Sequence, residues 1–407
     1  MSAPNVLTGT DQASLATDYA ATNYSSTADE TDHTTTHNPS SKQKYLLLSA
    51  HDFRSPRKAG MHFVASELAK MGTTRFFSLR YSFLSRYKHD PRISLDDQAN
   101  KIVFHQGVEC YLWKTLIHPI RIRPFESLMY HLYGYGFNSV LRDWIRDSDV
   151  IILESGVAPI FFDLIKKLNP KAKVLYRASD ALDTIDAATY ISKTFDRIAK
   201  EIDTIVLPSK ALAEKIPSTH NLAFVPQGID HSVNEKANPS PYGEGIHAVS
   251  VGSMLFDPDF FVLASRRFPH IHFHIIGSCQ PRHPEYGDNV TVYGEMPFDK
   301  TLPYIKHATL GIAPYSSVNL PAYLRDTSLK LTQYEFFGLP AICPHFIAAD
   351  YPTRFGYDIG NEESIALAIS RALNPQAPLP KRTVLDWSQV TERMLAPKKF
   401  SDTEVFA

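Results

Sequence analysis

Lys330 and Gln333 lie three residues apart in the segment 311–344, which we expect to form a strand, a helix and a second strand. The apolar runs GIAPY and LPAICP at its ends are typical of buried strands. Ser328 and the two residues before it are candidates to cap the helix. Because residues i and i+3 share one helix face, Lys330 and Gln333 point the same way. A lysine and a glutamine on a helix that begins at the carboxyl edge of a parallel sheet suit the diphosphate and sugar of a sugar nucleotide.

Asp180 is the first candidate for catalysis, because it follows the apolar run VLY in VLYRASD, where a strand should end. Loop residues at that edge of a parallel sheet are well placed for chemistry. A carboxylate in that position can act as a general base that takes the proton from an attacking hydroxyl. The alternative is that Asp180 caps a helix formed by DALDTI.

Gly252, Ser253 and Met254 form the expected turn after the strand HAVSV. A glycine at such a turn lets backbone amides approach a phosphate, although a plain turn explains the same pattern. Tyr293 and Gly294 follow the run NVTV in the same way.

Two patterns could be taken for metal sites. Asp257-Pro-Asp259 matches the DxD of metal-dependent glycosyltransferases, but it precedes the apolar run FFVLAS, where Asp and Pro commonly start a helix. His270, His272 and His274 alternate along a strand without a clear fourth ligand, and strand histidines more often pack under a helix. We therefore expect no metal and no other cofactor.

The segment 111–137 interleaves aromatic residues with cations over an apolar stretch. Trp113, Lys114, Arg121 and Arg123 are its candidates for contact with headgroups or with a lipid-linked substrate. Amphipathic core helices are common, so a packed core element is the alternative.

The elements that position these residues form two α/β series. Lys44–Ala50 and Gly60–Met71 read as a strand and a helix, and similar units recur up to TIVLPS, which predicts a parallel sheet covered by helices. A second series begins at HAVSVGS and ends at PAICP. We predict a disordered tail at 1–41, domains at 42–230 and 231–375, and a segment at 376–407 that returns to the first domain.

Composition limits the possible functions. The chain has 407 residues and a formal charge of -1, so no global field attracts it to nucleic acid. Residues 1–41 contain no Lys or Arg and no apolar run, and no window is long and apolar enough to span a bilayer. Cys110, Cys279 and Cys343 are odd in number and set among apolar residues, so we expect buried free thiols in a reducing compartment.

The string DTSLKLTQYEFFGLP, preceded by GIAPY, resembles the bacterial exopolysaccharide glucuronosyltransferases of the GumK type, which act in xanthan assembly. SVGSMLFDPDFF, NVTVYGEMPF, YIKHATLGIAPY and YRASD fit the same family in order and spacing, so the resemblance extends from about Tyr45 to at least Gly360. One departure is Leu329, where family members carry Met before the lysine.

The resemblance implies a GT-B fold, in which two Rossmann-like domains face a central cleft. It assigns the role of base to Asp180 and donor contacts to Tyr315, Lys330 and Gln333. It also implies that Met254 lines the nucleotide site and that the loop at Tyr293 and Gly294 meets the uracil through its backbone. The predicted catalytic and donor-site residues are Asp180, Gly252, Ser253, Met254, Tyr293, Gly294, Tyr315, Lys330 and Gln333.

The implied reaction moves glucuronic acid from UDP-glucuronate to a mannose of a polyprenyl-diphosphate-linked oligosaccharide, with inversion to a β-1,2 linkage and without metal. The loop 49–60, with Arg57 and Lys58, could receive the acceptor diphosphate or could be a plain basic loop. The resemblance implies a protein held peripherally at the cytoplasmic face of the bacterial inner membrane. We expect a monomer, although no residue pattern fixes the oligomeric state.

Two alternatives stay open at this point. The first is a GT-B transferase with another donor, such as a retaining enzyme, for which Glu335 on the Lys330 helix is the candidate acid. The second is a two-lobed solute-binding protein, against which the missing export signal argues.

Overall fold

The computed structural model describes residues 42–55, 58–88, 90–119, 124–218, 221–316, 320–380, 382–401, 403 and 405–406. The tail predicted for residues 1–41, Arg57, Arg121 and Arg123 lie outside the described residues. Residues 42–407 pack as one compact unit.

The first sheet has nine strands in the order β15-β8-β7-β6-β5-β1-β2-β4-β3. It is parallel except for β3, which pairs antiparallel with β4, and β15, which pairs antiparallel with β8. Its strands are β1 (Lys44–Ser49), β2 (Thr73–Ser82), β3 (Ile102–His105), β4 (Val108–Thr115), β5 (Val150–Glu154), β6 (Lys173–Arg177), β7 (Thr204–Leu207), β8 (Leu222–Phe224) and β15 (Val405–Phe406).

Helices cover this sheet because its central strands are apolar on both faces. In β1, Leu46 and Leu48 belong to one core cluster, whereas Tyr45 and Leu47 belong to another, as the alternation of side chains along a strand requires. The covering elements are α1 (Gly60–Met71), α2 (Glu126–Gly134), α3 (Ser139–Arg146), α4 (Phe162–Leu168), α5 (Thr189–Ile198) and the 3₁₀ turns η1 (Phe83–Lys88), η2 (Pro91–Gln98), η3 (Ala158–Phe161) and η4 (Lys210–Lys215).

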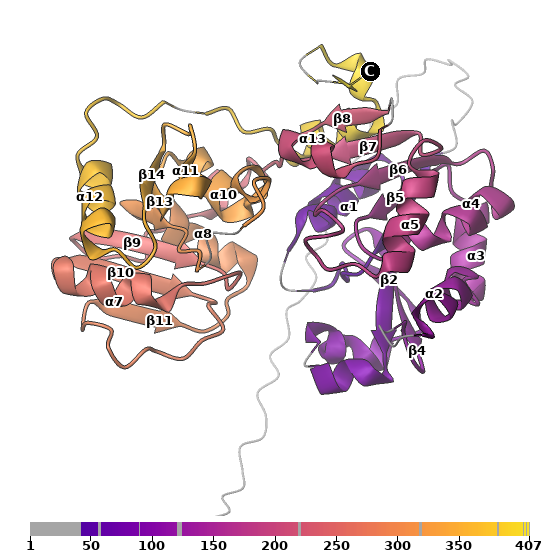
Figure 1. Ribbon diagram of the computed structural model, residues 1–407, viewed down its shortest axis with the longest axis horizontal. Coiled ribbons are helices and arrows are strands. Elements are labelled where there is room, and N and C mark those ends of the chain that lie inside the picture. Colours follow the sequence, from indigo (N-terminus) through magenta and orange to yellow (C-terminus); the bar gives the residue numbers. More distant parts are fainter. Residues whose placement is uncertain are drawn as a thin grey trace, which may run out of the picture. The chain divides into compact units, whose positions relative to one another are not determined.

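The second sheet has six parallel strands in the order β11-β10-β9-β12-β13-β14. Figure 1 shows its strands in coral to orange. Its strands are β9 (Ile246–Val251), β10 (Ile271–Ile276), β11 (Val290–Tyr293), β12 (Leu310–Ile312), β13 (Ala341–Pro344) and β14 (Arg354–Tyr357). Its helices are α6 (Val233–Lys236), α7 (Pro258–Arg267), α8 (Phe298–Lys306), α9 (Leu324–Thr327), α10 (Leu329–Phe337), α11 (His345–Ala348) and α12 (Glu362–Leu373).

The C-terminal segment packs on the first sheet and its helices. Helix α13 (Trp387–Leu395) lies against α1, where the ring of Trp387 stacks on Phe63 at a centroid distance of 5.0 Å. After the short turn η5 (Pro397–Lys399), β15 joins the edge of that sheet. The domain boundaries proposed from the sequence stay predictions.

Most elements predicted from apolar periodicity are present, and α1 spans the predicted residues 60–71. Two expectations differ from the structure. The segment DALDTI forms turns rather than a helix, and α5 begins only at Thr189. All three cysteines are free, but Cys279 is exposed, because it follows the turn at the end of β10 instead of packing inside.

Candidate active site

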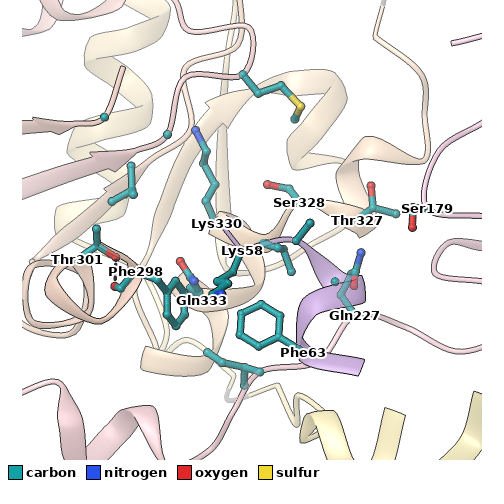
Figure 2. A pocket seen from close by; sticks show the side chains of 18 of the residues that line it. Lys58, Phe63, Ser179, Gln227, Phe298, Thr301, Thr327, Ser328, Lys330 and Gln333 are labelled. Carbon is teal, nitrogen blue, oxygen red and sulfur yellow. Dashed lines mark hydrogen bonds between the residues drawn. The ribbon is translucent and has the colours of Figure 1, made fainter. Parts of the chain in front are cut away.

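A cavity of about 460 Å³ is lined by residues that come from both halves of the chain. In Figure 2, Phe63 comes from α1, and Lys58, Ser179 and Gln227 come from loops that precede α1 or follow strands of the first sheet. Thr327, Ser328, Lys330 and Gln333 come from the second half of the chain. The predicted site residues that line this cavity are Lys58, Asp180, Gly252, Ser253, Met254, Lys330 and Gln333.

Asp180 lies three residues past the end of β6, in a turn that opens on the cavity. Its backbone N–H donates to Ser155 Oγ at 3.1 Å, and its Oδ1 accepts a hydrogen bond from the Tyr323 hydroxyl at 3.2 Å. Burial raises the pKa of the Asp180 carboxyl, and the nearby carboxylate of Glu154 raises it further, whereas Tyr323 and His51 oppose the shift. Since no helix starts here, the helix-cap alternative for Asp180 is wrong.

Glu154 is a second acid at this site that the sequence reasoning missed. It is the last residue of β5, is buried, and accepts hydrogen bonds from Ser49 Oγ and from Ser179 Oγ, the latter at 3.0 Å. An acid at the carboxyl end of the apolar run VIILE was the available signal, because neighbouring parallel strands end at one edge of the sheet.

Lys330 stands in the first turn of α10, which Ser328 caps by accepting a hydrogen bond from Leu331 N at 3.5 Å. Its Nζ lies 5.5 Å from the ring centroid of Tyr315, and no carboxylate among the described residues forms an ion pair with it. Burial lowers the pKa of Lys330 from 10.5 to about 8. Gln333 lines the same cavity, so the two side chains share a face as predicted.

Gly252, Ser253 and Met254 form a turn directly after β9. Gly252 has φ +94°, which favours glycine, and its N–H donates to Ile276 O at 2.9 Å. The Met254 side chain is 49% exposed at the cavity rim.

Three predicted donor-site residues do not line the cavity. Tyr315 is buried and shares a hydrogen bond of 2.9 Å with Ser328 Oγ, so it lies beneath Lys330. The hydroxyl of Tyr293 lies 3.1 Å from His274 Nδ1, which directs its side chain along the sheet. Gly294 follows Tyr293 and does not line the cavity either, whereas the next residue, Glu295, does.

Other cavity residues were also missed, although they too follow strand ends. Gln227 and Asp230 lie in the loop after β8, and Glu295 follows β11. The buried guanidinium of Arg177 donates to Gln227 Oε1 at 2.8 Å and thereby leaves the amide NH₂ of Gln227 free to turn toward the cavity.

Of the basic residues predicted in the loop before α1 to receive the acceptor diphosphate, Lys58 lies at the cavity. Lys58 lines the cavity, and its Nζ donates to Phe53 O at 3.0 Å. Arg54 is committed to a buried ion pair with Asp52 at 2.8 Å.

The predicted surface residues Trp113 and Lys114 need correction. Trp113 is 7% exposed and stacks on Tyr133 at 4.6 Å, so it belongs to the core. Lys114 forms an ion pair of 2.7 Å with Asp96. The exposed apolar residues of this region are instead Leu116, Ile117, Phe125, Leu128, Leu132, Tyr135 and Phe137.

The two metal-like patterns have structural roles. Asp257 caps α7 by accepting a hydrogen bond from Asp259 N at 3.1 Å, as the helix-start alternative predicted. The Nε2 atom of His274 lies 3.0 Å from Nδ1 of His247, and the His274 ring packs against the ring of Tyr242. Within the described residues, no group of three His, Cys, Asp or Glu side chains is arranged to hold a metal ion.

Glu335, the candidate acid of a retaining enzyme, does not line the cavity. It is buried and forms ion pairs with Arg354 at 2.6 Å and with Arg382 at 2.9 Å. These two cations hold its carboxylate in a structural network on the far side of α10 from Lys330 and Gln333.

Solved structures of low sequence identity share the fold. A sucrose-phosphate synthase from Thermosynechococcus elongatus has a TM-score of 0.57 at 13% identity, with 88% of this chain and 98% of that chain covered. The trehalose-6-phosphate synthase OtsA has a TM-score of 0.59 at 11% identity, with 89% and 100% covered. A UDP-forming trehalose-phosphate synthase from Burkholderia xenovorans has a TM-score of 0.57 at 11% identity, with 86% and 95% covered. These matches and the two sheets confirm the predicted GT-B fold.

Comparisons of sequence identify the family as well as the fold. Residues 47–208 match the family model of the glucuronosyltransferase GumK, N-terminal domain. The UDP-glucuronate:glycolipid 2-beta-glucuronosyltransferase of Xanthomonas campestris pv. campestris is 53% identical over 368 residues, which cover 89% of this chain and 92% of that protein. The chain therefore belongs to the GumK family of glucuronosyltransferases.

Proposed function

We propose that this protein transfers glucuronic acid from UDP-glucuronate to a hydroxyl of a glycolipid, with inversion at the anomeric carbon. Its relative from Xanthomonas campestris pv. campestris is named for that donor, a glycolipid acceptor and a 2-beta linkage. The finer proposal is a β-1,2 linkage to the mannose of a polyprenyl-diphosphate-linked oligosaccharide. The observation that carries the mechanism is that Asp180 and Lys330, from opposite halves of the chain, line one cavity.

Asp180 acts as the general base in this proposal. Its carboxylate takes the proton of the acceptor hydroxyl while that oxygen forms a bond to the anomeric carbon of the glucuronyl group. The bond from that carbon to the diphosphate breaks on the opposite face, and UDP leaves with the bonding electron pair. The raised pKa of Asp180 supports this role, because a more basic carboxylate accepts the proton more readily.

Lys330 stabilises the anionic donor and the departing UDP. Its side chain is half-buried at the wall of the cavity and has no carboxylate partner among the described residues, so an incoming anion is the missing counter-charge. The free backbone amides at the start of α10 add partial positive charge beside it. We propose that these groups make the reaction independent of a metal cofactor.

An apolar helix face supports peripheral attachment to a membrane, which we propose to be the cytoplasmic face of the bacterial inner membrane. Phe125, Leu128, Leu132 and Tyr135 recur every three or four residues along α2, and Phe137 follows. All five are exposed, and such a face can insert at the depth of the headgroups. No described helix is both long and apolar enough to cross a bilayer. We further propose that the protein works as a monomer.

The test is a transfer assay with a panel of UDP-sugars and a synthetic lipid diphosphate that carries mannosyl-cellobiose. The wild type should transfer only from UDP-glucuronate, in the presence of EDTA, and the product should carry a β linkage. Asp180→Ala should lose transfer while it retains UDP-glucuronate binding. Efficient transfer from another donor, or an α-linked product, would contradict the proposal and would revive a retaining mechanism.

A further inference from the structure

The general base is hydrogen-bonded by a residue from the other half of the chain. Tyr323 is 143 residues away in sequence, and its hydroxyl donates to Asp180 Oδ1 at 3.2 Å. Its side chain is only 2% exposed, so the ring is held by packing and the hydroxyl has little freedom to leave. No other hydrogen bond from the described side chains reaches the Asp180 carboxylate, which leaves Oδ2 to accept a proton.

Tyr323 belongs to the segment that leads into the donor-binding helix. It immediately precedes α9, its carbonyl accepts hydrogen bonds from Asp326 N and Thr327 N, and Ser328 then caps α10. Leu324, which follows Tyr323 directly, and Thr327 both line the cavity. Tyr323, whose hydroxyl binds the base, therefore lies seven positions before Lys330 in the sequence.

A second contact ties this segment to the first sheet. Ser209, which follows β7, donates through Oγ to Asp326 Oδ2, and Asp326 Oδ1 accepts from the Tyr351 hydroxyl at 2.6 Å. Among the described residues, the Ser209 and Tyr323 contacts both tie this segment to the first half of the chain, and the Tyr323 hydroxyl is the group that reaches the base.

We propose that Tyr323 is a positioning residue for the transfer reaction: from the segment that leads into the donor-binding helix, its hydroxyl orients the Asp180 carboxylate toward the acceptor hydroxyl. This inference rests on the proposed role of Asp180 as the base. Its consequence is that the base is aligned only when the α9 segment is seated, so the donor site and the base are coupled through one stretch of chain.

The charged and polar groups around Asp180 set the pH at which transfer activity is lost on the acidic side. Glu154 raises its pKa, whereas His51 and the Tyr323 hydrogen bond lower it, and the buried ring of Tyr176 lies close enough to feel its charge. Asp180 works in the ionised form, so activity falls as the pH drops through its pKa. Removal of the Tyr323 hydroxyl raises that pKa and moves the acidic limb of the kcat/KM profile to higher pH.

The decisive variant is Tyr323→Phe, which deletes one oxygen and keeps the packed ring. We expect kcat to fall about tenfold or more, because a hydrogen bond to a charged group is lost, while KM for UDP-glucuronate changes less than about twofold. The acidic limb should move to higher pH. Ser209→Ala is the matched control, because it removes the hydrogen bond from Ser209 to Asp326 and leaves the Tyr323 hydroxyl in place. The acidic limb of its kcat/KM profile should match that of the wild type.

A double variant separates this inference from the assignment of the base. If Tyr323 acts through Asp180, adding Tyr323→Phe to Asp180→Asn should reduce residual kcat no further. Wild-type kcat in Asp180→Asn would show that the base assignment is wrong. A Tyr323→Phe enzyme with wild-type kcat and pH profile would leave the base assignment intact and overturn the positioning role. Loss of donor binding, or a lowered unfolding temperature that accounts for the lost activity, would also overturn it.

Discussion

Replacing Lys330 with methionine should make the protein more stable and less active at the same time. The folded state lowers the pKa of Lys330 from 10.5 to about 8 by burial, so it disfavours the charged form. Each pKa unit corresponds to about 1.4 kcal/mol, which gives an upper limit of about 3 kcal/mol for the cost of that charge. The contact with the Tyr315 ring and water in the cavity offset part of this cost, so we expect a gain of about 1 to 2 kcal/mol at pH 7. Methionine is apolar, unbranched and flexible enough to fill the space of the lysine stem.

The pH dependence follows from the sign of the pKa difference. Below about pH 8, Lys330 is protonated in both the folded and unfolded states, and the wild type bears the full cost of the buried charge. Between about pH 8 and 10.5 the unfolded state binds more protons, so wild-type stability rises with pH relative to the variant. The advantage of Lys330→Met should therefore shrink steadily over that interval.

Urea unfolding at pH 7, 8.5 and 9.5 measures this difference, because other titrating groups are common to both proteins and cancel. Lys200, an exposed lysine after α5, provides the control, because Lys200→Met removes no buried charge. Isothermal titration with UDP-glucuronate should show at least about tenfold weaker binding by Lys330→Met, because the donor loses its counter-charge. A variant that is less stable than the wild type at pH 7, or a stability difference that does not change with pH, would refute the reasoning.

Three further predictions concern the base, the membrane face and the second sheet. Asp180→Asn should lower kcat by about 10² to 10⁴ and leave UDP-glucuronate affinity unchanged in calorimetry, since it removes general-base catalysis alone. Phe137→Ser should weaken sedimentation with anionic lipid vesicles and leave transfer to a detergent-soluble acceptor unchanged, because Phe137 is 72% exposed. Gly311→Ala should destabilise the fold by about 1 to 3 kcal/mol in urea, because a Cβ there would lie 2.5 Å from the buried ring of Tyr334. Gly243→Ala, whose Cβ would meet nothing within 4 Å, should be neutral in the same measurement.

Local patterns in the sequence determined much of the architecture and part of the site. The run KYLLLS is short and continuously apolar, which indicates a strand covered on both faces, and the structure has β1 there. Lys330 and Gln333 share a cavity wall because the period of the helix places residues three apart on one face. The edge positions of Asp180 and Gly252 follow from the rule that parallel strands open at their carboxyl ends.

Long-range packing decided the rest, since it depends on which side chains meet from distant parts of the chain. Trp113 and Phe137 belong to one aromatic stretch, yet Trp113 stacks in the core and Phe137 is exposed. Composition cannot distinguish them, because the outcome depends on where Tyr133 and its neighbours pack. The hydrogen bond from Tyr323 to Asp180 joins residues 143 positions apart and leaves no local signal in either segment. Only the folded chain, in which the turn after β6 meets the segment before α10, brings the base and its partner together.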